Sequence, residues 1–148
     1  NFFDSTDRTF FITGVQMEIG SSATPFEHKT FAQDLQECQR YYRQWASADS
    51  GNSFTRIGNG PAQAATHGVV SIILNPPMRA IPSATTSGQL QCYNGAAVSN
   101  CNAAIDASSS PYMVYSQWSS ASGMTVQHST DLICDDGAAN KFALSAEL

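Results

Sequence analysis

The sequence has 148 residues and a net charge of −5, and only 13% of its residues are charged. Its seven Lys and Arg residues are scattered along the chain, which disfavours binding to nucleic acid or to an acidic membrane, because both partners require clustered basic side chains. No apolar run reaches the roughly 18 residues of a membrane-spanning helix, and the length suits one domain with a buried core.

In chain order, the first predicted element is an extended strand over residues 9–19. Val15, Met17 and Ile19 alternate there with polar residues, which is the pattern of a half-buried strand. Residues 20–25 follow as a turn rich in small residues. The sequence therefore predicts a strand that enters the rest of the fold.

Residues 30–45 predict a short amphipathic helix. Thr30 suits the N-cap position, and Gln33 three residues later completes a capping box. Asp34 places a negative charge in the first turn, where the helix dipole favours it. Heptad spacing relates the apolar residues Phe31, Leu35, Cys38, Tyr42 and Trp45. This spacing predicts either a seam between subunits or a stripe packed on the chain's own sheet, and it leaves both interpretations open.

The remainder of the chain predicts short antiparallel strands. Residues 66–74 form a nearly continuous apolar run, which is typical of a central strand, and two prolines follow it. Asn94 and Gly95 are a hairpin signal, and residues 58–61 predict a turn. Further strands are predicted at residues 54–57, 89–93, 112–118, 124–128, 132–134 and 142–148. The predicted fold class is mainly β, with an entering strand, one connecting helix and a C-terminal antiparallel β-sandwich.

No pattern in the sequence is typical of catalysis or of metal binding. The three histidines lie far apart, and the acidic cluster at residues 131–136 lacks the ligand order of a calcium loop and is interpreted as a solvated turn. The four cysteines have no metal-finger spacing. Cys92 and Cys101 could close a short loop, but free buried thiols are favoured. We therefore expect no enzyme activity, no metal and no cofactor.

The aromatic residues are the best candidates for surface contacts, because their rings are apolar and carry a polar group. The candidates are Tyr93, Tyr112, Tyr115 and Trp118. The strand over residues 112–118 must turn one set of its alternating side chains outward. An exposed aromatic side chain there could stack on a sugar ring, while the favoured alternative is that a neighbouring subunit covers both faces.

Residues 14–42 read GVQMEIGSSATPFEHKTFAQDLQECQRYY. This segment closely resembles one found in many bacteriophage tail-fibre and virion structural proteins, where a strand of the form TGVQLEVG is followed by ATPFE and a helix ending in CQRYY. The stretches NPPMRAIP at residues 75–82 and KFALSAEL at residues 141–148 are similar to further motifs of that family. The strong match covers roughly residues 9–45, and the sequence between these motifs is not diagnostic.

The resemblance implies a division of the chain into three parts. Residues 1–26 would be the terminal strand of a preceding jelly-roll module, residues 27–46 the connecting helix, and residues 47–148 a C-terminal, jelly-roll-like β-sandwich domain. Because fibre proteins of this family are typically trimers, the resemblance favours the subunit-seam interpretation of the helix.

The function expected from the resemblance is that of a non-enzymatic virion protein, a distal tail-fibre module that contacts polysaccharide on the host cell surface. One alternative is a capsid decoration or head-fibre protein that reinforces the particle. Another is a carbohydrate-binding module of a larger enzyme. The expected partners are two further copies of the chain, other virion proteins and a bacterial surface glycan, and the expected location is the exterior of the virion.

Overall fold

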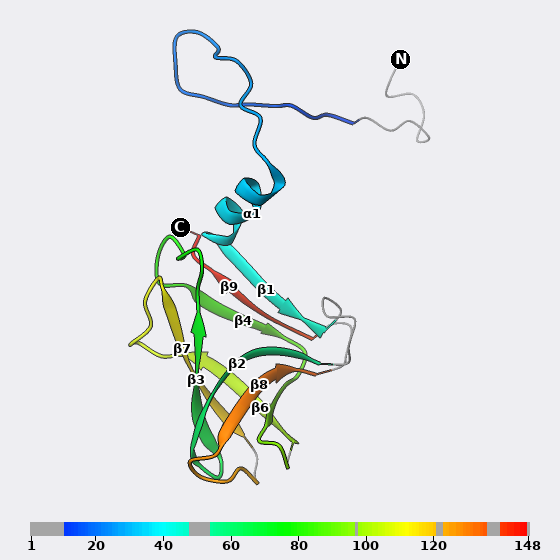
Figure 1. The fold of residues 1–148 in the computed structure, drawn as a ribbon, viewed down its shortest axis with the longest axis vertical. Helices are drawn as coiled ribbons and strands as arrows, with labels where there is room; N and C mark the ends of the chain where they lie inside the picture. Colours follow the sequence, from blue (N-terminus) through cyan, green and yellow to red (C-terminus); the bar gives the residue numbers. More distant parts are fainter. Residues whose placement is uncertain (1–10, 48–53, 97, 121–122, 136–139, 148) are drawn as a thin grey trace.

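The computed structural model describes residues 11–47, 54–96, 98–120, 123–135 and 140–147. The fold is mainly β, as predicted, with a short helix above a body of strands (Figure 1). The elements are α1 (Phe31–Gln39), β1 (Tyr42–Ala46), β2 (Thr55–Ala64), β3 (His67–Ile73), β4 (Ser83–Ser87), β5 (Leu90–Tyr93), β6 (Val98–Ile105), β7 (Met113–Ser120), β8 (Ser129–Cys134) and β9 (Lys141–Ser145). Within the described residues, no helix has the length and apolarity needed to cross a membrane.

Six strands close into an antiparallel barrel in the order β2-β3-β7-β6-β5-β8. The other three form a sheet in the order β1-β9-β4. The antiparallel pairing matches the expectation from the sequence, whereas closure into a barrel differs from the expected sandwich. Closure pairs both edges of every barrel strand, which removes the open edges that a sandwich leaves.

The barrel interior is filled by the inward side chains of alternate residues on each strand. Trp118 on β7 is the largest of the fully buried side chains and has only 1% of its surface exposed. It lies over Gly68 on β3, its partner in the β3–β7 register. A methyl group built on Gly68 would lie 2.5 Å from Trp118 Cζ2 and 2.6 Å from the carbonyl oxygen of Pro61. Glycine is therefore needed at position 68 to make room for the indole ring.

The three-stranded sheet shares its core with the barrel. Phe142 and Leu144 on β9 are fully buried. Trp45 on β1 packs against Phe142 with ring centroids 6.0 Å apart. The Cys134 thiol of β8 also donates a hydrogen bond to the Trp45 carbonyl, with sulfur and oxygen 3.3 Å apart. The sheet thus covers one end of the barrel rather than forming a separate layer (Figure 1).

The start of the helix is as predicted, but its end is not. Thr30 caps the helix, and it forms the full capping box with Gln33. The helix ends at Gln39, so the prediction of a helix to Trp45 was wrong over its last turns. The residues that were expected to continue it form β1, which pairs with β9. The Tyr41 carbonyl accepts a hydrogen bond from the Ala146 amide at 2.8 Å, so the C-terminal segment holds the chain extended from this point.

Residues 11–30 form an arm that projects from the body (Figure 1). No strand is present in this segment, so the predicted strand over residues 9–19 is not formed within its described part, and residues 9 and 10 lie outside the described residues. The arm is held as a loop by polar contacts. Thr24 Oγ1 donates to Glu18 Oε2 at 2.6 Å, and this hydrogen bond is the main reason why the pKa of Glu18 is lowered. Its apolar side chains, such as Met17 and Ile19, face solvent.

Among the predicted turns and strands of the body, two predictions were wrong and two are confirmed. Residues 58–61 lie inside β2 instead of forming a turn, because Gly60 allows the backbone of β3 to approach closely. Residues 124–128 form no strand, and β7 pairs with β3 and β6 instead. The apolar run is the central strand β3, with prolines after its end. The Asn94-Gly95 signal does mark the hairpin between β5 and β6.

Replacement of Gly68 tests the packing of the barrel interior. Gly68→Ala should lower the free energy of unfolding by about 1–3 kcal/mol, because the added methyl group overpacks the indole site. Urea unfolding followed by tryptophan fluorescence measures the change. The matched control is Gly20→Ala in the exposed arm, where the nearest atom is 3.6 Å from the new methyl group and the effect should stay within about 0.5 kcal/mol. Equal effects of the two changes would contradict the packing described here.

Trp45 and Tyr42 test which residues of the predicted helical stripe belong to the core. Trp45→Ala should destabilise the folded chain by about 2–3 kcal/mol, somewhat less than a fully buried Trp, because its ring packs on Phe142. Tyr42→Ala on the same strand should have little effect, because the Tyr42 side chain is 45% exposed. Thermal unfolding of both variants gives the comparison. A Trp45→Ala variant as stable as the parent would place this ring outside the core.

Candidate functional site: a cavity on the outer face of the barrel

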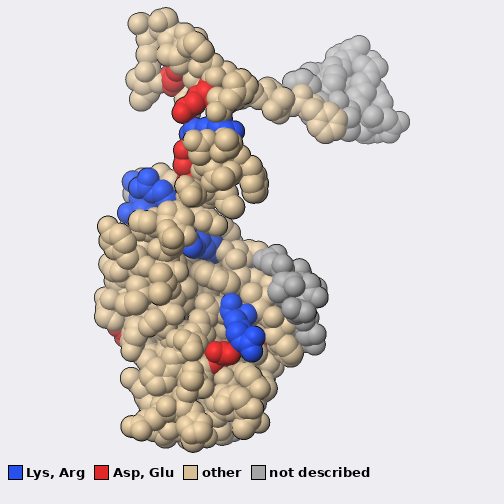
Figure 2. Space-filling model, in the orientation of Figure 1, with Lys and Arg blue, Asp and Glu red and all other residues tan. Residues whose placement is uncertain are grey.

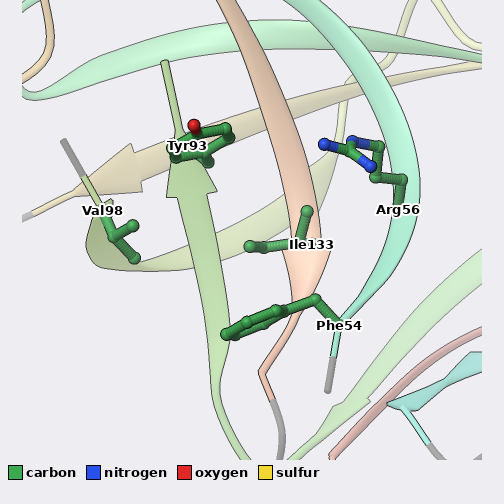
Figure 3. Close-up of a pocket in the computed structure, with 5 residues that line it drawn as sticks. All are labelled: Phe54, Arg56, Tyr93, Val98 and Ile133. Carbon is green, nitrogen blue, oxygen red and sulfur yellow. The ribbon is translucent and has the colours of Figure 1, made fainter. Parts of the chain in front are cut away.

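A cavity of about 330 Å³ lies on the outer face of the barrel, over β2, β8, β5 and the start of β6. Its lining residues are Phe54, Arg56, Tyr93, Val98 and Ile133. Figure 3 shows their side chains arranged around a common space, with Ile133 at the centre. Three stretches that are distant in sequence, at residues 54–56, 93–98 and 133, therefore contribute to one site.

The alternation of side chains along each strand explains why these residues meet. Leu132 on β8 and Cys92 on β5 point into the barrel and are fully buried, so their neighbours Ile133 and Tyr93 point outward. The register then sets the neighbours across the strands. Arg56 lies opposite Ile133, and Tyr93 lies opposite Val98.

Most of the cavity wall is hydrocarbon. Ile133 forms the floor, and only 6% of its surface is exposed although it faces outward. Phe54 and Val98 rise beside it and are 48% and 55% exposed. Exposed apolar surface that gathers in one concave place is typical of a ligand or partner site, whereas single exposed apolar side chains are ordinary.

One ion pair adjoins the cavity. Arg56 Nε donates to Asp131 Oδ2 at 2.7 Å, and Asp131 faces outward beside Tyr93 in the β5–β8 register. The Asp131 carboxylate raises the pKa of Arg56, which keeps the guanidinium charged. The Arg56 side chain is 71% exposed, and its two Nη groups make no further hydrogen bond to the residues that the structure describes. These donors remain available to a ligand.

Tyr93 is held in place by its own hydroxyl group. The hydroxyl donates to the Gly95 carbonyl in the hairpin, with the oxygens 3.2 Å apart. Gly95 has a φ of +88°, in the left-handed region that favours glycine. The turn that the Asn94-Gly95 pair predicted thus also positions an aromatic ring of the cavity.

A second, shallower hollow of about 210 Å³ lies over β3, β7 and β6, on the other side of the barrel. Its outward side chains are polar, and they include His67, Asn102 and Gln117. It has no exposed aromatic ring, because the ring of Trp118 beneath it points into the core. The first cavity is therefore the stronger candidate for a binding site.

The structure separates the four aromatic residues predicted as surface contacts. Tyr93 lines the cavity, whereas Tyr112 is 67% exposed next to β7 and Tyr115 is partly buried on that strand. Trp118 is in the core, so its assignment to a surface site is corrected. Phe54, Arg56 and Ile133 were not predicted, because only the pairing of distant strands brings them together, and Val98 was not predicted although the hairpin places it opposite Tyr93.

The predicted seam residues also divide into two groups. Phe31 is 81% exposed and Leu35 is 42% exposed, and no residue of α1 is buried. Cys38 is exposed on the same helix. Tyr42 and Trp45 lie on β1, and Trp45 packs into the chain's own core. Of the five predicted seam residues, only Phe31, Leu35 and Cys38 lie on the helix.

Among the described residues, no group of three or more His, Cys, Asp or Glu side chains could hold a metal ion. The four cysteines are free thiols, as favoured from the sequence, and all except Cys38 are buried. A hydrogen bond with the neighbouring Cys101 thiol, together with burial, raises the pKa of Cys92. Cys92 is consequently kept as a neutral thiol in the barrel core.

Comparison of the chain with protein-family models, with curated proteins and with solved structures found no match.

Proposed function

We propose that the chain is a non-enzymatic receptor-binding module of a bacteriophage virion, located in the distal part of a tail fibre, and that it binds polysaccharide on the bacterial surface. The observation that carries the binding role is the outer cavity with two aromatic rings beside the Arg56–Asp131 pair. The resemblance of residues 14–42 to fibre and virion proteins supports the location. A protein that only reinforces the particle would need no such cavity.

The cavity has the two kinds of surface that a sugar ring requires. The C–H faces of a sugar are apolar and can pack on the rings of Phe54 and Tyr93. The hydroxyl groups of a sugar donate and accept hydrogen bonds, which the Arg56 guanidinium and the Asp131 carboxylate can supply at the rim. Hydrogen bonds to charged groups are stronger than those between neutral groups, so this pair would fix the orientation of the ring.

The surface charge is consistent with a neutral or weakly charged ligand. On the face shown in Figure 2, basic side chains appear in separate small groups and form no continuous patch. The net charge of −5 opposes long-range attraction of a polyanion. Recognition would therefore depend on contacts inside the cavity and less on steering by charge.

We further propose that the module is a trimer whose subunits meet along α1. The helix has nine residues and no buried side chain, and a helix of this length is marginal in water without packing. Phe31 and Leu35 leave an apolar stripe without a partner among the described residues of the chain. The three cavities of one trimer would raise the avidity by about 10²–10⁴-fold without any new contact.

Removal of the cavity rings tests the binding role. Phe54→Ala and Tyr93→Ala should each weaken binding about tenfold, because each deletes an aromatic contact surface. Biolayer interferometry against immobilised surface polysaccharides from a panel of bacterial strains gives the affinities. The control is Tyr112→Ala, which removes an exposed ring outside the cavity. If no polysaccharide binds, or if all three variants bind equally, the proposed role is wrong.

A charge on the helix stripe tests the trimer. Leu35→Asp should convert the trimer into monomers that remain folded, because the new carboxylate would be buried without a partner in the seam. Light scattering on a sizing column gives the mass, and circular dichroism reports the fold. Gln36→Asp adds the same charge to the helix about 100° away and should leave the mass unchanged. A monomeric parent chain, or a trimeric Leu35→Asp variant, would contradict this seam.

A further inference from the structure

The cavity has one polar end and one apolar end. In the strand order β2-β8-β5-β6, Arg56 stands on the first strand and Val98 on the last, and Ile133 lies between them (Figure 3). Neighbouring strands are ~4.8 Å apart, so roughly 14 Å of sheet separates the two ends. A ligand that fills the cavity therefore meets an ion pair at one side and hydrocarbon at the other.

The polar end suits adjacent hydroxyl groups. The Arg56 guanidinium keeps both Nη groups as donors, and its Asp131 partner accepts through carboxylate oxygens. Two neighbouring hydroxyls on a sugar ring can pair with one donor and one acceptor in this arrangement. The charges of Arg56 and Asp131 already compensate each other, so an anionic ligand would meet the carboxylate as well as the guanidinium. A neutral sugar fits this end best.

The apolar end suits a methyl group. The side chains of Val98 and Ile133 have no atom that can form a hydrogen bond, and neither has that of Phe54, whose ring reaches from the start of β2 past Ile133 (Figure 3). The hydroxyl of Tyr93 donates its proton to the Gly95 carbonyl, so toward a ligand it can only accept. A sugar hydroxyl placed against the described side chains of Phe54, Val98 and Ile133 would lose its hydrogen bonds to water and gain none from these three side chains. A methyl group in the same place would instead gain from leaving water.

We propose that the cavity selects neutral 6-deoxyhexoses, the sugars that carry a methyl group where ordinary hexoses carry a hydroxymethyl group. Adjacent ring hydroxyls bind at Arg56 and Asp131, and the C6 methyl packs against Val98 and Ile133. This inference rests on the proposed glycan-binding function and adds the class of sugar. An N-acetyl sugar fits less well, because its amide needs hydrogen-bond partners that the described side chains of Phe54, Val98 and Ile133 do not offer.

A matched pair of sugars tests the selection. L-Rhamnose and L-mannose differ only in the hydroxyl at C6. NMR titration of the ¹⁵N-labelled 148-residue chain with each sugar gives the two dissociation constants. L-Rhamnose should bind about fourfold more tightly or better, which is the gain expected for burying one methyl-sized group. L-Fucose and L-galactose provide a second pair with the same single difference.

Two variants separate the contributions of the two ends. Val98→Thr keeps the shape of the side chain but places a hydroxyl in the apolar wall, so it should reduce the preference for L-rhamnose towards equality. Val126→Thr makes the same change at an exposed valine outside the cavity and should leave the preference intact. Asp131→Asn should weaken both sugars to a similar extent and leave their ratio unchanged, because it alters only the polar end.

Each result decides between specific outcomes. Three results would overturn the 6-deoxy selection: equal affinities for the two sugars, tighter binding of N-acetylglucosamine, or no response to L-rhamnose up to about 100 mM. A dissociation constant of about 100 mM corresponds to only about 1.4 kcal/mol of binding free energy. If bacterial polysaccharide still binds through Phe54 and Tyr93 in that case, the glycan-binding function stands. If no polysaccharide binds either, both proposals fail.

Discussion

The contact between Gly68 and the ring of Trp118 is the constraint on which the rest of the barrel depends. The indole is the largest of the fully buried side chains, and it fits only because residue 68 has no side chain. Once Trp118 points inward, every second side chain of β7 must also point inward. The register with β3 then determines which side chains of β3 face the interior. A slip of one residue would turn every inward side chain of that strand to solvent.

The outer cavity is a consequence of this phase. Around the barrel, the inward positions of β8 and β5 hold Leu132 and Cys92, and the positions beside them must face out. Outward positions of a barrel in water are usually polar, yet Ile133 faces out and is nearly covered by its neighbours. Its side chain is therefore packed by residues of the same chain. Together with the two aromatic rings and the ion pair, it leaves a concave and mostly apolar surface, which supports the proposed ligand site.

The parts of the structure that depend on local sequence could be predicted. The capping box at Thr30, the central strand β3 and the Asn94-Gly95 hairpin are all set by residues within a few positions of each other. The end of the helix could not be predicted, since the segment after Gln39 is drawn into a strand by β9, about a hundred residues later in the sequence. Barrel closure likewise depends on β8 pairing with both β2 and β5, which strand count does not reveal.

The candidate site also combines residues that could be predicted from the sequence with residues that could not. Tyr93 could be identified as a contact residue from its type and its place before a turn. Arg56 and Asp131 are 75 residues apart, and only the β2–β8 register brings them together. Trp118 was misassigned because an alternating strand with aromatic residues at both kinds of position does not state which face is inside. The partners inside the barrel decide that question, and they come from other strands.

A map of the contacts between the chain and bacterial polysaccharide would test the proposed binding site. Amide NMR spectra of the ¹⁵N-labelled chain, recorded with and without a polysaccharide that binds, would locate the contact. We expect the largest shifts to cluster on the outer face of β2, β8 and β5, around Arg56, Ile133 and Tyr93. Shifts concentrated at Tyr112 and Tyr115, or along α1, would place the contact elsewhere and contradict the proposed binding site.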